Sequence, residues 1–257
     1  MRLTVIGCSG SFPGPDSPAS AYLVAVPDPA DEQKVWRILL DVGNGSLGVL
    51  QRHIDPLSLD AIFLTHLHPD HCLDLCGLYV MHRYQPGGRT ARRLPVYGPA
   101  GTARRIERAY GGDVHRLERA YDFLRLRDGE PVSVGPVTVT PYLMNHPVET
   151  YGFRVTSGDA VLAYTGDTDT CDNLTPLLRG ADLALVECAF VDGRDAERGI
   201  HLSGSRAAAA AVAAGGVRRL MLTHLPSWND PEVCRAQAAA EWPGEVELAA
   251  PEGTYDF

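Results

Sequence analysis

Three of the nine histidines of this chain fall between His66 and His71, together with an aspartate, directly after the apolar run Ala61 to Leu64. An apolar run of this length is typical of a buried strand, so the polar cluster begins where a rigid element ends. Side chains of an extended segment alternate between its two faces, and His66 and His68 are therefore expected to point to the same side. The fold must hold this cluster at the end of a buried strand.

The remainder of the cluster is predicted to turn in another direction. Pro69 ends the extended segment, and Asp70 and His71 then open a helix that carries their side chains toward a second metal ion. Imidazole and carboxylate ligands together suit zinc, manganese or iron, and a catalytic site also leaves a coordination position for water. A surface cluster of histidines that binds no metal is the alternative interpretation.

Three further residues of ligand type, His146, Asp167 and His224, each follow an apolar and strand-like run. Taken alone, a histidine after a strand is more often an ordinary loop residue than a metal ligand. Taken together with the cluster at His66 to His71, these residues favour a metal site built at several strand ends.

Short apolar runs and helix-like stretches are spread along the whole chain. Strands are predicted at nine β-branched or aliphatic runs: Leu3 to Ile6, Ala21 to Val26, Val35 to Leu40, Ala61 to Leu64, Val137 to Tyr142, Gly152 to Val155, Val161 to Tyr164, Leu183 to Val186 and Leu220 to Leu222. Helices are predicted over Asp70 to Tyr84, Thr102 to Tyr110, Asp172 to Leu178, Ser205 to Ala214 and Pro231 to Glu241, with Asp230 as an N-cap. Such a mixture suggests two sheets sandwiched between helices. No linker divides the chain, so residues 1–257 are expected to form a single domain.

Length and composition are those of a globular protein with a large core, with 257 residues, 45% hydrophobic and 21% charged. No stretch is long and apolar enough to cross a bilayer, and no signal-peptide pattern opens the chain, so a cytoplasmic protein without membrane contact is predicted. Six cysteines in such a chain are expected to be reduced thiols. Cys72 and Cys76, four residues apart on a predicted helix, are expected to pack rather than bind metal.

The net charge of −9 argues against a dedicated nucleic-acid binder. Between Arg83 and Arg108, however, there are seven arginines and a single acid, Glu107. One face could therefore attract an anionic substrate through long-range charge. A solvated, arginine-rich surface without such a role is an equally weighted alternative.

The order and spacing of the ligand-type residues resemble the five-motif pattern of the metallo-β-lactamase superfamily, from Thr4 to about Leu225. The resemblance implies an α/β metallo-β-lactamase fold, a four-layer αββα sandwich of two mixed sheets flanked by helices. It also implies two divalent metal ions, with zinc favoured and manganese the alternative, about 3.5 to 4 Å apart and joined by a bridging hydroxide. The implied ligands are His66, His68 and His146 for one ion, Asp70, His71 and His224 for the other, and Asp167 as the bridge. Asp41 would orient the ligands without binding metal.

Glu187 and His201 resemble the paired glutamate and histidine motifs of the RNase Z group of phosphodiesterases. In that group the histidine protonates the leaving alkoxide, and the glutamate keeps the imidazole protonated and correctly turned. Glu187 and His201, together with Asp70, are therefore predicted to be catalytic residues. The alternative for His201 is that it only caps the helix beginning near Ser203 or Ser205.

One departure from RNase Z bears on the substrate. That enzyme carries a long arm that grips tRNA between the motifs matching His146 and Asp167, whereas here only 20 residues separate them. A hairpin from Val148 to Tyr164 is predicted to fill this interval. Other stretches resemble the atypical class II cyclic-nucleotide phosphodiesterases of actinobacteria: Gly7 to Ser11, Gly14 to Ser20, Asp70 to Leu75 and His201 to Gly204.

These resemblances imply a dinuclear metal-dependent phosphodiesterase that hydrolyses 3′,5′-cyclic nucleotides, with cyclic AMP favoured, to 5′-monophosphates. An RNase Z-like ribonuclease or another hydrolase of small phosphodiesters is the alternative. A non-catalytic metal-binding protein is disfavoured because no ligand position is lost, and a β-lactamase is disfavoured because lactam hydrolysis has no evident use for Glu187 and His201. The expected partner is a small phosphodiester, with no stable nucleic-acid partner, and a homodimer is left open.

Overall fold

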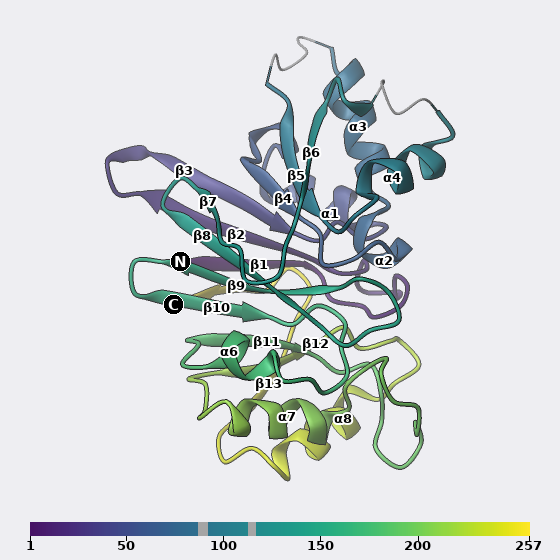
Figure 1. Cartoon of the computed structure of the whole chain (residues 1–257), viewed down its shortest axis with the longest axis vertical. Coiled ribbons are helices and arrows are strands. Elements are labelled where there is room, and N and C mark those ends of the chain that lie inside the picture. The colour runs from purple at the N-terminus through teal and green to yellow at the C-terminus, as the bar shows by residue number, and fades with distance from the viewer. Residues whose placement is uncertain (87–91, 113–116) are drawn as a thin grey trace.

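The computed structural model describes residues 1–86, 92–112 and 117–257. Two seven-stranded sheets lie face to face, and helices cover the outer face of each sheet, which gives four layers (Figure 1). The predicted two-sheet sandwich between helices is therefore confirmed.

The first sheet has the order β14-β1-β2-β3-β4-β5-β6. Its strands are β1 (Arg2–Gly7), β2 (Ala21–Asp28), β3 (Asp31–Leu40), β4 (Ala61–Phe63), β5 (Leu94–Gly98), β6 (Tyr121–Arg125) and β14 (Thr254–Asp256). The pairs from β14 to β3 are antiparallel and those from β3 to β6 are parallel, so the sheet is mixed. Its outer face is covered by α1 (Ser46–His53), η1 (Pro56–Ser58), α2 (Pro69–Cys72), α3 (Leu75–Tyr84) and α4 (Thr102–Tyr110).

The second sheet has the order β13-β12-β11-β10-β9-β8-β7 and is mixed in the same way. Its strands are β7 (Val132–Val134), β8 (Val137–Leu143), β9 (Tyr151–Ser157), β10 (Ala160–Tyr164), β11 (Leu183–Glu187), β12 (Leu220–Thr223) and β13 (Val246–Leu248). The helices α6 (Leu174–Leu178), α7 (Gly204–Ala213) and α8 (Pro231–Ala239) cover its outer face (Figure 1).

The central strands β1, β11 and β12 are buried along nearly their whole length, because helices or the other sheet cover both faces of each sheet. In β3, Ile38 and Leu40 join the core between the two sheets, while Leu39 between them joins the core beneath α1 to α4. Across the central layer, Tyr22 of β2 packs against Tyr164 of β10 with ring centroids 4.8 Å apart. This close packing fixes the ends of the two sheets relative to one another.

The nine predicted strands are present, and β9 and β10 form the predicted hairpin between His146 and Asp167. The sequence patterns missed α1, β5, β6, β7, β13 and β14. The prediction of one helix over Asp70 to Tyr84 was wrong, because the chain turns between α2 and α3. There Asp74 accepts a hydrogen bond from the backbone of Leu47 at 2.8 Å.

That turn also corrects the placement of Cys72 and Cys76, which lie on different helices. Cys72 is buried, with Sγ 3.2 Å from the carbonyl oxygen of His68. All six cysteines are free thiols, as predicted. Within the described ranges, no helix is both long enough and apolar enough to cross a membrane.

Candidate metal centre

Seven residues of ligand type converge where strands of both sheets end. His66 and His68 follow β4, Asp70 and His71 lie in α2, and His146, Asp167 and His224 follow β8, β10 and β12. The extended strand expected to carry His66 and His68 already ends at Phe63, so the two histidines stand on a loop. Within the described part of the chain, these seven residues form two groups that could each hold a metal ion.

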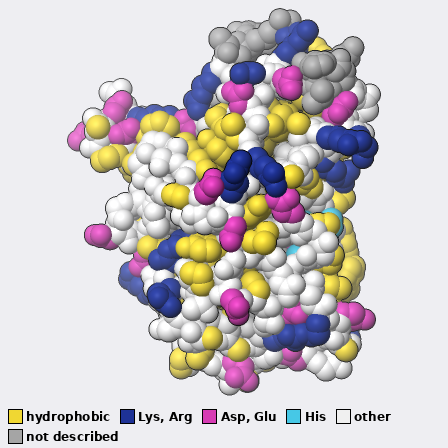
Figure 2. Space-filling view, in the orientation of Figure 1, with side chains coloured by type: hydrophobic (Ala, Val, Ile, Leu, Met, Phe, Trp, Pro, Cys, Tyr) yellow, Lys and Arg dark blue, Asp and Glu magenta, His cyan; other side chains and the backbone are white. Residues whose placement is uncertain are grey.

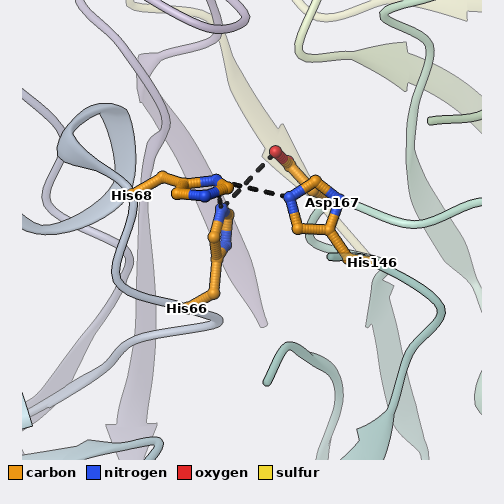
Figure 3. A group of neighbouring side chains, drawn as sticks. All are labelled: His66, His68, His146 and Asp167. Carbon is orange, nitrogen blue, oxygen red and sulfur yellow. Dashed lines mark hydrogen bonds and ion pairs between the residues drawn. The ribbon is translucent and has the colours of Figure 1, made fainter. Parts of the chain in front are cut away.

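The first group contains His66, His68, His146 and Asp167 (Figure 3). His68 Nδ1 lies 3.0 Å from His66 Nε2 and 3.3 Å from His146 Nε2. Asp167 Oδ2 lies 3.6 Å from His66 Nε2. Three imidazole nitrogens and one carboxylate oxygen thus point toward one another, as donor atoms do around a shared cation.

The second group contains Asp70, His71, His224 and again Asp167. His71 Nε2 lies 3.4 Å from Asp70 Oδ2 and 3.2 Å from Asp167 Oδ1. His224 Nε2 lies 3.4 Å from Asp167 Oδ2. Asp167 is the residue that belongs to both groups, which places its carboxylate between them.

Two buried atoms test whether a cation fits this arrangement. His71 Nε2 and Asp167 Oδ1 have no hydrogen-bond partner among the described residues, although they lie only 3.2 Å apart. Buried polar atoms without partners destabilise a fold and are therefore uncommon. A divalent cation would satisfy both atoms, so the residues present fit a metal.

The charges around the second group also favour a cation. Burial lowers the pKa of His71, but the carboxylates of Asp167, Asp41 and Asp70 outweigh it and raise that pKa well above its ordinary value. Burial likewise raises the pKa of Asp167, but the imidazoles of His224, His71 and His66 outweigh it and hold the pKa well below its ordinary value. Asp167 is therefore an ionised carboxylate in a buried place.

Asp41 supports the ligands from behind. Its Oδ2 accepts hydrogen bonds from His71 Nδ1 and from Tyr164 Oη, both at 2.8 Å, and its Oδ1 accepts one from the Thr65 amide at 2.7 Å. Because His71 donates through Nδ1, its Nε2 is left to face Asp70 and Asp167. This geometry agrees with the orienting role expected of Asp41.

Two other ligands have similar support, which the sequence alone did not reveal. His224 Nδ1 lies 2.9 Å from Ser20 Oγ, and His146 Nδ1 donates to the carbonyl oxygen of Ile200 at 2.8 Å. Ser20 stands in one of the stretches that suggested the phosphodiesterase resemblance, but no pattern there pairs it with His224. Both contacts turn Nε2 of the histidine toward the centre.

Asp41 and His224 share an unusual backbone. Each follows directly after a strand, and each has a left-handed conformation, with φ of 57° and 55°. Residues other than glycine adopt this conformation at a cost of about 1–2 kcal/mol. The turn sends both side chains back toward the ligand groups.

His201 and Glu187 stand beside the two groups. His201 Nδ1 lies 2.8 Å from Glu187 Oε1, and the His201 ring centroid lies 5.3 Å from that of His146 and 5.7 Å from that of His224. Glu187 is fully buried, and its carboxylate also accepts bonds from the amides of Thr168 and Ala189 at 3.0 and 2.9 Å.

This pairing decides the charge of His201. Burial lowers the pKa of His201, but the charge of Glu187 and its hydrogen bond outweigh burial and raise the pKa to about 9. Helix α7 begins at Gly204 with Ser203 as its N-cap residue and has no side-chain cap bond. Among the residues described, no hydrogen bond from the His201 side chain caps this helix, so the structure gives no support to the alternative in which His201 is only a helix cap.

The sequence itself matches a known family over most of its length. A family model described as a β-lactamase superfamily domain matches residues 36–225, which include all seven residues of the two groups. The chain belongs to the β-lactamase superfamily.

Relatives of this superfamily chain are similar over nearly their whole length. An uncharacterized protein of Mycobacterium leprae is 44% identical, covering 100% of this chain and 89% of that protein. A probable metallo-hydrolase of Bacillus subtilis, YhfI, is 31% identical over 97% of both chains, and its crystal structure superposes with a TM-score of 0.86 over 99% of both. A Ribonuclease Z of Mycobacterium bovis is 30% identical, covering 96% of this chain and 95% of that protein. The metallo-β-lactamase fold is thus shown, and the chain is a metallo-hydrolase of that superfamily.

The buried carboxylate of Asp169, which no sequence motif indicated, holds the segment that carries His201. Asp169 is 1% exposed, and its carboxylate accepts bonds from the Gly199 amide at 2.7 Å and from Arg206 Nη1 at 2.6 Å. Arg198 Nε lies 3.0 Å from the same carboxylate. Only its place two residues after Asp167 could have drawn attention to Asp169.

One arginine of the region between Arg83 and Arg108 makes a specific contact with the loop that carries metal ligands. Arg105 Nε donates to the carbonyl oxygen of Leu67 at 3.1 Å, so it supports the loop between His66 and His68. Figure 2 shows Lys and Arg side chains gathered over α4, above the place where histidine atoms reach the surface. Arg89 lies outside the described residues.

Proposed function

We propose that this metallo-hydrolase is a dinuclear phosphodiesterase that cleaves 3′,5′-cyclic nucleotides, with cyclic AMP favoured, to 5′-monophosphates. The observation that carries the proposal is the pair of the partly exposed His201 and the buried Glu187 beside the two ligand groups. A protonated imidazole next to a metal centre suits a reaction whose leaving group is a basic alkoxide. Lactam hydrolysis has no evident use for such a pair.

The seven residues of the two groups would hold two divalent ions, with Asp167 shared between them. Zinc is favoured because its usual protein ligands are imidazole nitrogens and carboxylate oxygens, and manganese is the alternative. When bound, such a pair of ions lowers the pKa of water and stabilises charge on a phosphoryl group. Asp70 is proposed to serve both as a ligand and in catalysis.

His201 is proposed to be the proton donor. Because Nδ1 of His201 is engaged by Glu187, Nε2 is the nitrogen that can donate to a substrate. An oxygen atom from water bonds to phosphorus as the P–O3′ bond of the cyclic nucleotide breaks, and O3′ takes the proton of His201, so the product is a 5′-monophosphate with a free 3′-hydroxyl. Glu187 is a positioning residue that keeps the imidazole charged and correctly turned.

A ribonuclease acting on RNA ends is the second candidate. The similarity to Ribonuclease Z of Mycobacterium bovis, over nearly the whole of both chains, supports it. Against it, the interval between His146 and Asp167 is filled by the short hairpin of β9 and β10, which leaves no long arm for gripping RNA.

A turnover screen distinguishes these functions. The purified protein, loaded with Zn²⁺ or Mn²⁺, is supplied in parallel with cyclic AMP, cyclic GMP, bis-p-nitrophenyl phosphate, a tRNA precursor and nitrocefin. We expect the highest kcat/KM for a cyclic nucleotide, with the 5′-monophosphate as product, and loss of most of this turnover in Asp167→Ala prepared in the same way. Preference for the tRNA precursor, without hydrolysis of cyclic nucleotides, would overturn the proposal in favour of the ribonuclease.

A further inference from the structure

Two aromatic side chains lie together on loops that adjoin His224 of the metal centre. Phe12 stands on the loop between β1 and β2, and Trp228 on the loop between β12 and α8. Their ring centroids are 4.9 Å apart with planes tilted by 44°. Trp228 is 63% exposed, although an indole is among the side chains that gain most from burial.

The loop of Phe12 contacts a residue of the metal centre directly. The Ser11 amide lies 3.4 Å from His224 Nε2, and the Gly10 amide donates to the carbonyl oxygen of Leu225 at 3.1 Å. Phe12 follows Ser11 in the chain, so its Cα lies only about 3.8 Å beyond that of Ser11. The backbone of Phe12 therefore lies close to His224 and to the second ligand group.

The loop of Trp228 is fixed by its neighbour. Asn229 is 7% exposed, donates to the carbonyl oxygen of Ala189 at 2.8 Å and accepts a bond from Arg194 at 2.9 Å. These contacts tie the loop to the segment between Glu187 and His201. The indole is thus exposed on an anchored backbone, four residues after His224.

We propose that Phe12 and Trp228 form the stacking platform for the purine base of the substrate. The inference rests on the proposed function, since it names the part of the nucleotide that these rings would bind. A nucleobase is a planar aromatic ring, and stacking on an exposed aromatic side chain accepts any base because every base has a π face. We therefore expect the platform to favour nucleotides over phosphates without a base, and to discriminate weakly between adenine and guanine.

Stacking is remote from the bond that breaks, so it should act on binding more than on the chemical step. An interaction of equal strength in the ground state and the transition state changes KM and leaves kcat nearly constant. For Trp228→Ala we expect KM for cyclic AMP to rise roughly tenfold, with kcat within about twofold of the unmodified protein. Trp228→Phe, which keeps an aromatic face, should restore most of the lost affinity.

Binding of two probes tests the platform without turnover. Calorimetry on the metal-loaded protein compares 5′-AMP with ribose 5-phosphate, which has the same phosphate and no base. We expect 5′-AMP to bind roughly tenfold more tightly, and Trp228→Ala to bind the two probes alike. The matched control is Tyr84→Ala, because Tyr84 is a similarly exposed aromatic residue, 61% exposed, at the far end of α3. This control should keep the full preference for 5′-AMP.

The platform is refuted when the unmodified protein binds 5′-AMP and ribose 5-phosphate equally, or when Trp228→Ala keeps the preference. Hydrolysis of cyclic AMP is measured on the same preparations and tests the proposed function separately. A protein that hydrolyses cyclic AMP but shows no preference between the probes would keep its function and lose the platform. Because Trp228 is exposed, its replacement is not expected to disturb folding, which circular dichroism checks.

Discussion

Replacing His201 by alanine should affect two kinds of phosphodiester differently: those that expel a basic alkoxide and those that expel a weakly basic phenolate. A cyclic nucleotide expels an alkoxide, which needs a proton as the bond breaks. Bis-p-nitrophenyl phosphate expels a phenolate, which needs little protonation. His201→Ala is therefore expected to impair the first reaction far more than the second.

The size of the effect follows from the environment of His201. Because Glu187 raises the pKa of His201 to about 9, the protonated form of His201 predominates at pH 7. His201 can therefore act as a proton donor at pH 7, and His201→Ala should lose the whole rate enhancement that a positioned acid provides. That contribution is on the order of 10² to 10⁴ in rate. For the activated ester we expect a loss below about tenfold.

The assay measures kcat for both substrates on the unmodified protein and on His201→Ala, with metal content determined on the same samples. Misfolding or loss of metal would lower both activities together and is therefore recognised. Equal losses on the two substrates, with metal content intact, would show that His201 only binds phosphate or supports the structure. The role of proton donor would then have to be abandoned.

The pH dependence of cyclic-nucleotide hydrolysis is a second test of the role of His201. A donor acts in its protonated form, so cyclic-nucleotide hydrolysis should decline as the pH rises through the pKa of His201. Burial lowers the pKa of His201, the charges of Glu187 and Asp167 raise it, and the charge of His71 lowers it. Glu187→Gln removes the first-named charge, and we expect the alkaline decline to move to lower pH. An unchanged profile would contradict this account.

Three further outcomes follow from the site. Asp167→Ala removes the carboxylate shared by both ligand groups, so metal content should fall below two ions per chain and turnover should fall by more than about 100-fold. The circular dichroism spectrum should be unchanged. Near-normal turnover would refute the bridging role of Asp167. Asp169→Asn weakens the hold on Gly199 and should lower kcat severalfold for cyclic AMP but not for bis-p-nitrophenyl phosphate. If the arginines between Arg83 and Arg108 steer the substrate, kcat/KM should fall between 0.1 and 1 M salt, as the Debye length shrinks from about 10 to 3 Å. A rate indifferent to salt would leave them a solvated surface.

Strands that are buried on both faces could be predicted because their apolar runs are unmistakable, as in Leu183–Glu187. Helix α8 could be predicted from local chemistry, since Asp230 caps it and Pro231 occupies its first position. Strand β14 could not, because Thr254–Asp256 is three residues long, partly exposed and defined only by pairing with β1 at the other end of the chain. The break between α2 and α3 likewise depends on a tertiary contact, that of Asp74 with Leu47.

The same division holds at the metal centre. The residues of the two ligand groups could be found because the sequence marks them by residue type, strand ends and resemblance to a family. Their supporting contacts could not be found, because Ser20 meets His224 across 204 positions of sequence and Ile200 meets His146 across 54. Serine and a backbone carbonyl carry no signature of such a role, so only the folded arrangement reveals them.

The left-handed backbone at Asp41 and His224 has a consequence for engineering the stability of this protein. Glycine at either position would relax the backbone by about 1–2 kcal/mol, and it would also delete a carboxylate or an imidazole from the centre. At Asp41 the loss of the carboxylate would leave the buried His71 Nδ1, Tyr164 hydroxyl and Thr65 amide without their acceptor, so glycine there is expected to lower stability as well as activity. Stabilised variants are better sought elsewhere in the molecule, with metal present and turnover included in the selection.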